Sequence, residues 1–365
     1  MPKRGENIRK RKDGRWEGRY KPNGEPNYKS VYGVSYAEVK AVLGLAKQQN
    51  ADKSKGIIQE KDVESISLEW LESVKIRVKT STYASYHTIA KSHIIPYFRG
   101  VDVSTLTDGI IELFVKTKIE KGLSPKRIRD ITAILLQILK YAKKRYRMKL
   151  SGYDITLPKV HIKKITVLTA EQQEKLIKYI QNNLNRSTLG ILIVLFTGLR
   201  LGELCALKWG NVDFEAGELT ITKTIQRVKN LAPKAKIKTK LIIDEPKSEK
   251  STRNIPLPLF LAEILKIFSK NHDRNEYILT GTIKPLDPRT CQNRFKAHLE
   301  TAGIKDINFH ATRHTFATRA IEAEFDYKSL SEILGHSSVK FTLDRYVHSS
   351  QEQKKICMAK MAKCY

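Results

Sequence analysis

Five residues in the second half of the sequence carry side chains suited to chemistry at a phosphodiester. His310 and Arg313 are three residues apart, so a helix would place them on one face. Arg200 supplies a second guanidinium group; it opens a helix just after Gly198, at which the preceding apolar helix would end. His336 also follows a glycine at which a helix would end. Planar guanidinium groups can clamp the non-bridging oxygens of one phosphate and stabilise the charge of a pentacoordinate transition state. Tyr346, ten residues after His336, is then a candidate nucleophile.

Other chemistries fit these segments less well. Glu203 stands one helical turn after Arg200 and could hold its guanidinium group. His310 and His314 are four residues apart, as in a helical zinc site, but Ala311 stands where that site carries its glutamate base. The sequence has no G-x-x-x-x-G-K-[ST] loop and no G-x-G-x-x-G turn, and a two-metal nuclease would need clustered carboxylates. We therefore expect phosphodiester chemistry with no cofactor and no metal.

The charge of the chain favours a polyanionic partner. Its 365 residues have a formal net charge of +29, with 14 basic against 7 acidic residues in 1–60, 21 against 10 in 61–165, and 32 against 21 in 166–365. The apolar run from Leu189 to Leu199 is shorter than the roughly 18 residues of a membrane span. The charged N-terminus lacks the apolar core of a secretory signal, and four scattered cysteines argue against disulfides. We expect a cytoplasmic, nucleoid-associated protein that does not contact membranes.

The N-terminal segment has the pattern of a small sheet backed by one helix. Three strands are predicted at 6–12, 15–21 and 28–32, separated by Asp-Gly and Asn-Gly turns, and a helix is predicted after Ser35. The strands carry basic residues interleaved with aromatic ones, which favours contact with a DNA groove over a merely solvated sheet face. The predicted DNA-binding residues here are Arg9, Arg11, Arg15, Arg19 and Lys29.

The middle segment is predicted to be helical. A polar stretch at 51–62 suits a linker, and helices are predicted at 67–74, 83–97, 110–121 and 125–147. The last of these helices ends in a basic run whose side chains either contact phosphate or form a solvated helix end; these residues include Lys143, Lys144 and Arg145. A second linker follows Pro158.

The remaining segment mixes helices and strands. Helices are predicted at 170–183 and 185–196, strands around 219–225, and a hairpin at 241–257 with its turn at 247–250. The residues after Pro258 are predicted to be mainly helical. The fold class is thus a multidomain α+β protein, with a small three-stranded-sheet-plus-helix N-terminal domain, an all-α core-binding domain and a mixed, mainly α catalytic domain with a small antiparallel sheet.

Five motifs occur in an order typical of one enzyme family. They are T-G-L-R-L-G-E at 197–203, P-K-S-E-K-S-T-R-N-I-P-L at 246–257, H-A-T-R-H-T at 310–315, L-G-H-S at 334–337 and L-D-R-Y-V-H around Tyr346. On these motifs the chain resembles the tyrosine recombinases, in particular the integrases of temperate phages and conjugative transposons. That resemblance implies a site-specific DNA recombinase, which integrates and excises a mobile element or prophage.

The resemblance also implies a role for each motif residue. Tyr346 would attack one DNA strand and leave a 3′-phosphotyrosine and a free 5′-hydroxyl, while Arg200 and Arg313 clamp the phosphate. Lys247 would protonate the leaving 5′-oxygen, although Lys250 on the same presumed turn is an alternative. His310 would help accept the tyrosine proton, and His336 would hydrogen-bond the phosphate. A phenol with a pKa of about 10 needs such help to become a nucleophile.

The same resemblance implies a function for each predicted segment. Residues 1–55 would be an arm-type DNA-binding domain, 63–155 a helical core-binding (SAM-like) domain, and 166–365 the catalytic domain. The tail at 351–365 is amphipathic if helical; it would pack on a neighbouring protomer or, alternatively, cap its own domain. The implied partners are double-stranded DNA with core and arm-type attachment sites, a homotetramer in the synaptic complex, an excisionase and a host DNA-bending protein.

Two other functions remain open at this point. A type IB topoisomerase shares the phosphotyrosine chemistry but works as a monomer on any sequence, and the separate N-terminal sheet argues against it. A non-catalytic DNA-binding repressor on the same fold would be expected to lack part of the Arg, His and Tyr set, all of which is present.

Overall fold

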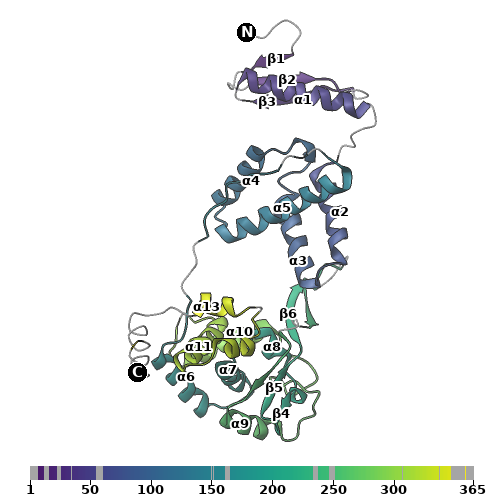
Figure 1. Ribbon diagram of the computed structural model, residues 1–365. Helices are drawn as coiled ribbons and strands as arrows, with labels where there is room; N and C mark the ends of the chain where they lie inside the picture. The colour runs from purple at the N-terminus through teal and green to yellow at the C-terminus, as the bar shows by residue number, and fades with distance from the viewer. Residues whose placement is uncertain are drawn as a thin grey trace. The chain divides into compact units, whose positions relative to one another are not determined.

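The chain divides into two compact units, Met1–Val160 and His161–Tyr365. The computed structural model (Figure 1) describes residues 7–11, 16–22, 26–33, 35–54, 61–148, 150, 152–160, 165–232, 237–245, 251–305, 307–336, 338–346 and 358. Within this described part, no helix combines the length and the apolar character that a bilayer span requires.

The first unit begins with an antiparallel sheet of three strands in the order β1-β2-β3. These strands are β1 (Ile8–Lys10), β2 (Trp16–Tyr20) and β3 (Lys29–Gly33), and helix α1 (Tyr36–Ser54) packs against them. Ile8, Val39 and Leu43 form the buried contact between sheet and helix. A Cβ at Gly18 would lie only 2.8 Å from Val39 Cγ1, so the close approach of helix and sheet depends on glycine there. The predicted three strands and helix are confirmed.

The predicted boundary of the first linker is wrong at its start. Helix α1 continues to Ser54, whereas the polar composition of 51–62 led us to expect a linker from residue 51. The residues of this last turn, Ala-Asp-Lys-Ser, include the good helix formers alanine and lysine, so a helix can continue without an apolar face.

The rest of the first unit is helical, as predicted. Its elements are α2 (Val63–Lys75), α3 (Thr80–Ile89), a π-helical turn (Ala90–Ile94), a 3₁₀ turn (Val103–Thr105), α4 (Asp108–Glu120) and α5 (Pro125–Tyr146). The N-caps Asp62, Thr107 and Ser124 each accept a hydrogen bond from a backbone N–H of the first turn, which fixes where α2, α4 and α5 begin. An apolar core of its own includes Ile66, Trp70, Phe98, Phe114 and Leu135.

The second unit surrounds one apolar helix with helices and two small antiparallel sheets (Figure 1). The helices are α6 (Ala170–Asn182), α7 (Arg186–Thr197), α8 (Leu201–Ala206), the 3₁₀ turn Trp209–Asn211, α9 (Leu259–Ser269), α10 (Pro288–Thr301), α11 (Phe309–Glu322), α12 (Tyr327–Leu334) and α13 (Val339–Tyr346). The sheets are β4 (Val212–Asp213), β5 (Glu218–Ile221) and β8 (Arg253–Pro256) in the order β4-β5-β8, and β6 (Thr224–Lys229) paired with β7 (Thr239–Asp244). The predicted hairpin at 241–257 is therefore wrong: β7 pairs with β6, and β8 joins β5 in the other sheet.

The core of this unit centres on α7, in which Leu189, Ile193, Val194 and Leu195 are buried. Because α7 is apolar on all sides, other elements can pack around it. One of these is α11, which packs directly against α7 and carries the predicted His310 and Arg313.

Candidate active site

The turn between α7 and α8 positions Arg200. Gly198 ends α7 with φ at 64°, a left-handed conformation, and a Cβ there would lie 2.5 Å from Phe316. The chain then reverses, and Arg200 becomes the N-cap residue of α8. The predicted break between these helices is therefore confirmed, and glycine is required at it for both backbone and packing reasons.

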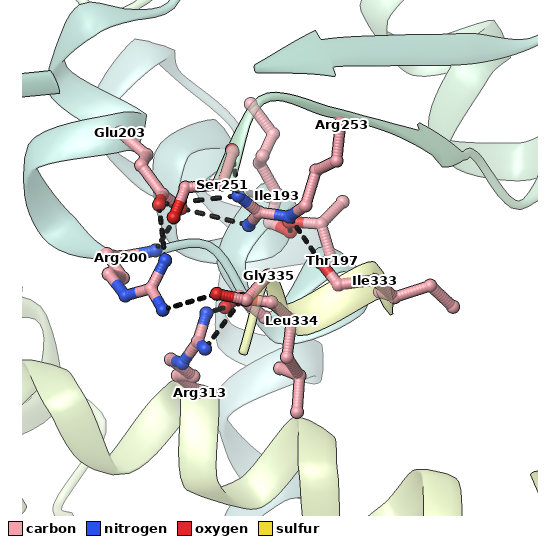
Figure 2. A network of polar contacts seen from close by, with 11 residues as sticks. Ile193, Thr197, Arg200, Glu203, Ser251, Arg253, Arg313, Ile333, Leu334 and Gly335 are labelled. Carbon is pink, nitrogen blue, oxygen red and sulfur yellow. Dashed lines mark hydrogen bonds and ion pairs between the residues drawn. The ribbon is translucent and has the colours of Figure 1, made fainter. Parts of the chain in front are cut away.

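Glu203 is a buried carboxylate between two arginines. It is 2 % exposed and accepts hydrogen bonds from the Arg200 backbone N–H at 3.0 Å and from Arg200 Nη1 at 2.7 Å. Figure 2 shows Arg253 on the other side of this carboxylate, where its Nη2 donates to Glu203 Oε2 at 3.0 Å. Burial acts to raise the pKa of Glu203, but the charges of Arg253 and Arg200 outweigh it and hold the pKa below its ordinary value. The carboxylate is thus ionised and fixes both guanidinium groups.

Arg253 forms hydrogen bonds with three parts of the site, and the sequence analysis did not identify it as a site residue. It is the first residue of β8, and its Nε donates to the carbonyl of Ile333 in α12 at 2.5 Å. Its Nη1 donates to the Ser251 carbonyl at 3.0 Å. The signal that could have revealed it is the arginine of the motif at 246–257, which begins the strand R-N-I-P three residues after Lys250.

Arg313 reaches the same place from α11. Its side chain is among the largest that are fully buried, and its Nη1 and Nη2 donate to the carbonyls of Gly198 and Leu334, both at 2.7 Å. Arg200 Nη2 donates to the neighbouring Gly335 carbonyl at 3.0 Å, so the two guanidinium groups converge on the end of α12 (Figure 2). Burial, followed by the charge of Arg200, lowers the pKa of Arg313 to about 9, which leaves the group charged at neutral pH.

His336 follows the left-handed Gly335 that ends α12 and lies beside Tyr346. Its Nδ1 is 2.8 Å from Thr342 Oγ1, and its ring is nearly parallel to that of Tyr346, with centroids 6.2 Å apart. Burial lowers the pKa of His336 to about 3, with further contributions from Arg313 and Arg200. His336 is therefore neutral near pH 7 and can donate or accept one hydrogen bond without adding charge.

Tyr346, the last residue of α13, is 9 % exposed and contacts a second histidine of α11. Its hydroxyl lies 2.7 Å from His314 Nδ1. His310 is exposed one turn earlier, and its ring centroid is 4.6 Å from that of His314. The sequence placed His314 in a possible zinc pattern and in the motif at 310–315, but its contact with Tyr346 was not foreseen.

The structure thus brings together six of the predicted residues: Arg200, Glu203, His310, Arg313, His336 and Tyr346. Lys247 and its alternative Lys250 lie outside the described residues, as do Arg15 and, apart from Met358, the tail at 351–365. In the described part of the chain, no group of three or more His, Cys, Asp and Glu side chains could hold a metal ion. Cys205 and Cys291 are buried free thiols.

The other predicted DNA-binding residues belong to the first unit. Glu17, in β2, accepts a hydrogen bond from Arg9 Nε at 2.8 Å and pairs with Arg11 at 3.7 Å. The guanidinium carbon of Arg19 is 5.4 Å from the Tyr28 ring centroid, and Lys29 begins β3. The basic run at the end of α5 is exposed, and there Lys143 Nζ donates to the Leu150 carbonyl at 2.7 Å; its other members are Lys144 and Arg145.

Comparison with known proteins identifies the family. The model of the phage integrase family matches residues 166–353, and that of the phage integrase N-terminal SAM-like domain matches 63–119. The chain belongs to the phage integrase family. This integrase is an enzyme of the tyrosine-type site-specific recombinase class.

Two relatives match this integrase over most of their length. A tyrosine recombinase XerC-like protein of Caldanaerobacter subterraneus subsp. tengcongensis is 29 % identical over 360 residues, which is 91 % of this chain and 90 % of the relative. The ICEBs1 integrase of Bacillus subtilis is 26 % identical over 292 residues, or 76 % and 77 % of the two chains.

Solved structures match the fold at lower identity. The Tn1549 transposon integrase in complex with transposon right end DNA has a TM-score of 0.67 at 23 % identity and covers 83 % of this chain and all of that one. A lambda integrase dimer bound to a core site has a TM-score of 0.60 at 16 % identity and covers 95 % and 97 %. The predicted α+β fold with small antiparallel sheets is therefore confirmed.

Proposed function

We propose that this integrase cuts and rejoins DNA strands through a phosphotyrosine at Tyr346, and so integrates and excises a mobile element. The observation that carries this proposal is the convergence of Arg200 and Arg313 on one point beside Tyr346 and His336. A phosphate has two non-bridging oxygens, and two planar guanidinium groups suit their recognition.

The arginines bind the scissile phosphate in this account. Each guanidinium has five N–H donors, so the bonds to the carbonyls of Gly198, Leu334 and Gly335 hold the two groups while other donors face the phosphate. Glu203 and Arg253 hold Arg200 in place before DNA arrives. This preorganised positive charge favours the additional negative charge of the transition state.

The remaining groups move protons or contact the phosphate. Tyr346 Oη attacks phosphorus, and Lys247, or Lys250 in its place, protonates the 5′-oxygen that leaves. A histidine of α11 takes the phenol proton, a role that the family resemblance assigns to His310. The neutral His336 hydrogen-bonds the phosphate. The bond to Tyr346 retains the energy of the phosphodiester, so rejoining to a new 5′-hydroxyl needs neither ATP nor a metal.

The family and what its solved members bind support the proposed partners. The 63–155 and 166–365 segments would hold duplex DNA at core sites, and the 1–55 segment would bind arm-type sites through Arg9, Arg11, Arg15, Arg19 and Lys29. Lambda integrase has been solved as a tetramer bound to a Holliday junction, which supports a homotetramer here. An excisionase and a host DNA-bending protein would assist, and the tail at 351–365 would pack on a neighbouring protomer.

A nicked suicide duplex that carries the element's end tests this function. Cleavage releases the short fragment beyond the nick, so the covalent protein–DNA adduct accumulates. We expect an adduct with the unmodified integrase and none with Tyr346→Phe. An adduct that forms equally on unrelated duplexes would favour a topoisomerase, and specific binding without any adduct would favour a repressor.

A further inference from the structure

The hydroxyl of Tyr346 contacts a histidine to which the family motifs assign no role. His314 Nδ1 lies 2.7 Å from Tyr346 Oη, and the two ring centroids are 5.5 Å apart. His314 is 8 % exposed and Tyr346 is 9 % exposed, so water competes little for this contact. The contact joins α11 to the last residue of α13, across 32 residues of sequence.

The charged and titratable groups around this pair are mostly cations. Arg313 and His310 lie on α11 itself, Arg200 and Glu203 at the start of α8, Arg253 on β8, and His336 in the turn after α12. Positive charge near a phenol favours its ionised form, and positive charge near an imidazole favours its neutral form. The cations therefore ease the loss of the Tyr346 proton and keep His314 neutral, so that it can accept the proton, but they do not favour the imidazolium that results.

The geometry selects one nitrogen for this transfer. A neutral imidazole accepts through the nitrogen that carries no hydrogen, so Nδ1 accepts when the proton of the ring is on Nε2. A general base must lie about 2.6–3.2 Å from the atom whose proton it takes, and the Nδ1 to Oη distance falls in that range. His310, the residue expected to take this proton, is exposed in the first turn of α11.

We infer that His314, in place of His310, is the general base of strand cleavage and takes the proton of Tyr346 as the phenol oxygen attacks. This inference rests on the proposed function. The O–H bond of Tyr346 breaks and its proton forms a bond to His314 Nδ1, while Oη forms a bond to phosphorus. The bond from phosphorus to the 5′-oxygen breaks, and a lysine proton completes the leaving hydroxyl. On rejoining, the imidazolium of His314 returns the proton to Oη.

Single-turnover adduct formation on the suicide duplex, measured from pH 5.5 to pH 9, tests this role. In the unmodified integrase the rate should fall at low pH, because protonated His314 cannot accept a proton. His314→Asn should slow adduct formation about 100-fold, as expected for the loss of a general base, and should remove this low-pH fall. His310→Asn, one turn away on α11, is the matched control and should retain the fall.

A tyrosine with a lower phenol pKa distinguishes a catalytic role of His314 from a structural one. Incorporation of a fluorinated tyrosine at position 346 lowers the pKa of the phenol, so its proton is lost without help. In His314→Asn this substitution should recover at least about tenfold of the lost rate, a gain that a purely structural defect would not allow. Thermal unfolding and duplex binding of each variant show whether it is folded.

Two outcomes would overturn the inference. One is a His314→Asn profile that has the shape of the unmodified one, merely scaled down, with no recovery by fluorotyrosine. The other is loss of the low-pH fall in His310→Asn instead. If His314→Asn does not fold, the test uses fluorotyrosine at position 346 in the otherwise unmodified integrase. The rate of adduct formation should then fall at the same pH as before. A fall whose pH shifts together with the pKa of the phenol would contradict the inference. Failure of the proposed function itself differs, since the unmodified integrase would then form no adduct, or Tyr346→Phe would still form one.

Discussion

Two glutamates of this integrase each hold two arginines, in very different surroundings. In the N-terminal sheet, Glu17 pairs with Arg9 and Arg11, whose side chains are 64 % and 40 % exposed. In the second unit, Glu203 pairs with Arg253, which is 6 % exposed, and with Arg200, at 38 %. The distances are similar, at 2.8 Å from Arg9 to Glu17 and 3.0 Å from Arg253 to Glu203.

We infer from this difference that the same kind of ion pair serves two purposes. Exposed arginines are screened by salt and keep side-chain freedom, so they suit variable contacts to DNA phosphates. A buried pair is held by several backbone carbonyls and is little screened, so it suits a fixed position at the reacting phosphate. We therefore expect the Glu203 cluster to govern folding and chemistry, and the Glu17 cluster to govern affinity.

Removal of each glutamate should give the largest contrast. Glu203→Ala leaves Arg253 buried without its carboxylate and should lower the free energy of unfolding by about 3–5 kcal/mol. Glu17→Ala should have a much smaller effect, because Arg9 and Arg11 remain in contact with water. Denaturant unfolding, monitored by hydrogen exchange in α8 and in β2, measures the loss of stability in each variant. Equal losses would show that burial does not distinguish the two clusters.

Arg313→Lys should slow adduct formation by about 100- to 1,000-fold, since lysine cannot donate the paired hydrogen bonds of a guanidinium group. Arg19→Lys in the sheet is the matched control and should change the rate little. Single-turnover cleavage with saturating enzyme isolates this effect from DNA affinity. A comparable loss in both variants would contradict the assignment of chemistry to the buried cluster.

Acid should weaken the buried site through His336. The pKa of this histidine is about 3 in the folded protein and about 6.5 when unfolded, so the unfolded chain binds more protons between these values. Stability should therefore fall as the pH drops from about 6.5 toward 3, and His336→Gln should reduce this slope. This dependence of stability on pH is measured by the hydrogen-exchange protection factors in α12 at pH 7 and pH 5, corrected for intrinsic exchange. The same slope in both proteins would count against a buried neutral His336.

The smallest effect on cleavage should come from the sheet. Arg9→Gln should lower the salt dependence of DNA binding by about one unit in the slope of log K against log salt, as for loss of one phosphate contact. It should leave the cleavage rate of bound core duplex unchanged. Fluorescence anisotropy at several salt concentrations gives the slope, and a slower cleavage step would link the sheet to the chemistry.

Local patterns predicted the helix ends that position Arg200 and His336. Gly198 and Gly335 end their helices with positive φ, and the N-cap position of Arg200 follows from its place after the turn. The Arg200–Glu203 pair was also predictable, because residues three apart on a helix are neighbours. These features depend on only a few adjacent residues.

Long-range pairing was not predictable in the same way. Alternation and turn residues indicated strands, but they do not say which strands pair, so β7 was wrongly joined to β8 rather than β6. Glu203 and Arg253 are in contact although 50 residues separate them in sequence, and His314 contacts Tyr346 across 32 residues. Such contacts depend on how α8, β8, α11 and α13 pack, which no local motif encodes.

The central claim is that Tyr346 forms the bond to DNA, and mass spectrometry of the trapped adduct tests it most directly. The adduct from the suicide duplex would be digested with nuclease and protease, and the nucleotide-bearing peptide sequenced. We expect a nucleotide joined through its 3′-phosphate to Tyr346, and no adduct with Arg313→Lys in the same reaction time. A nucleotide on any other residue, or joined through a 5′-phosphate, would contradict it.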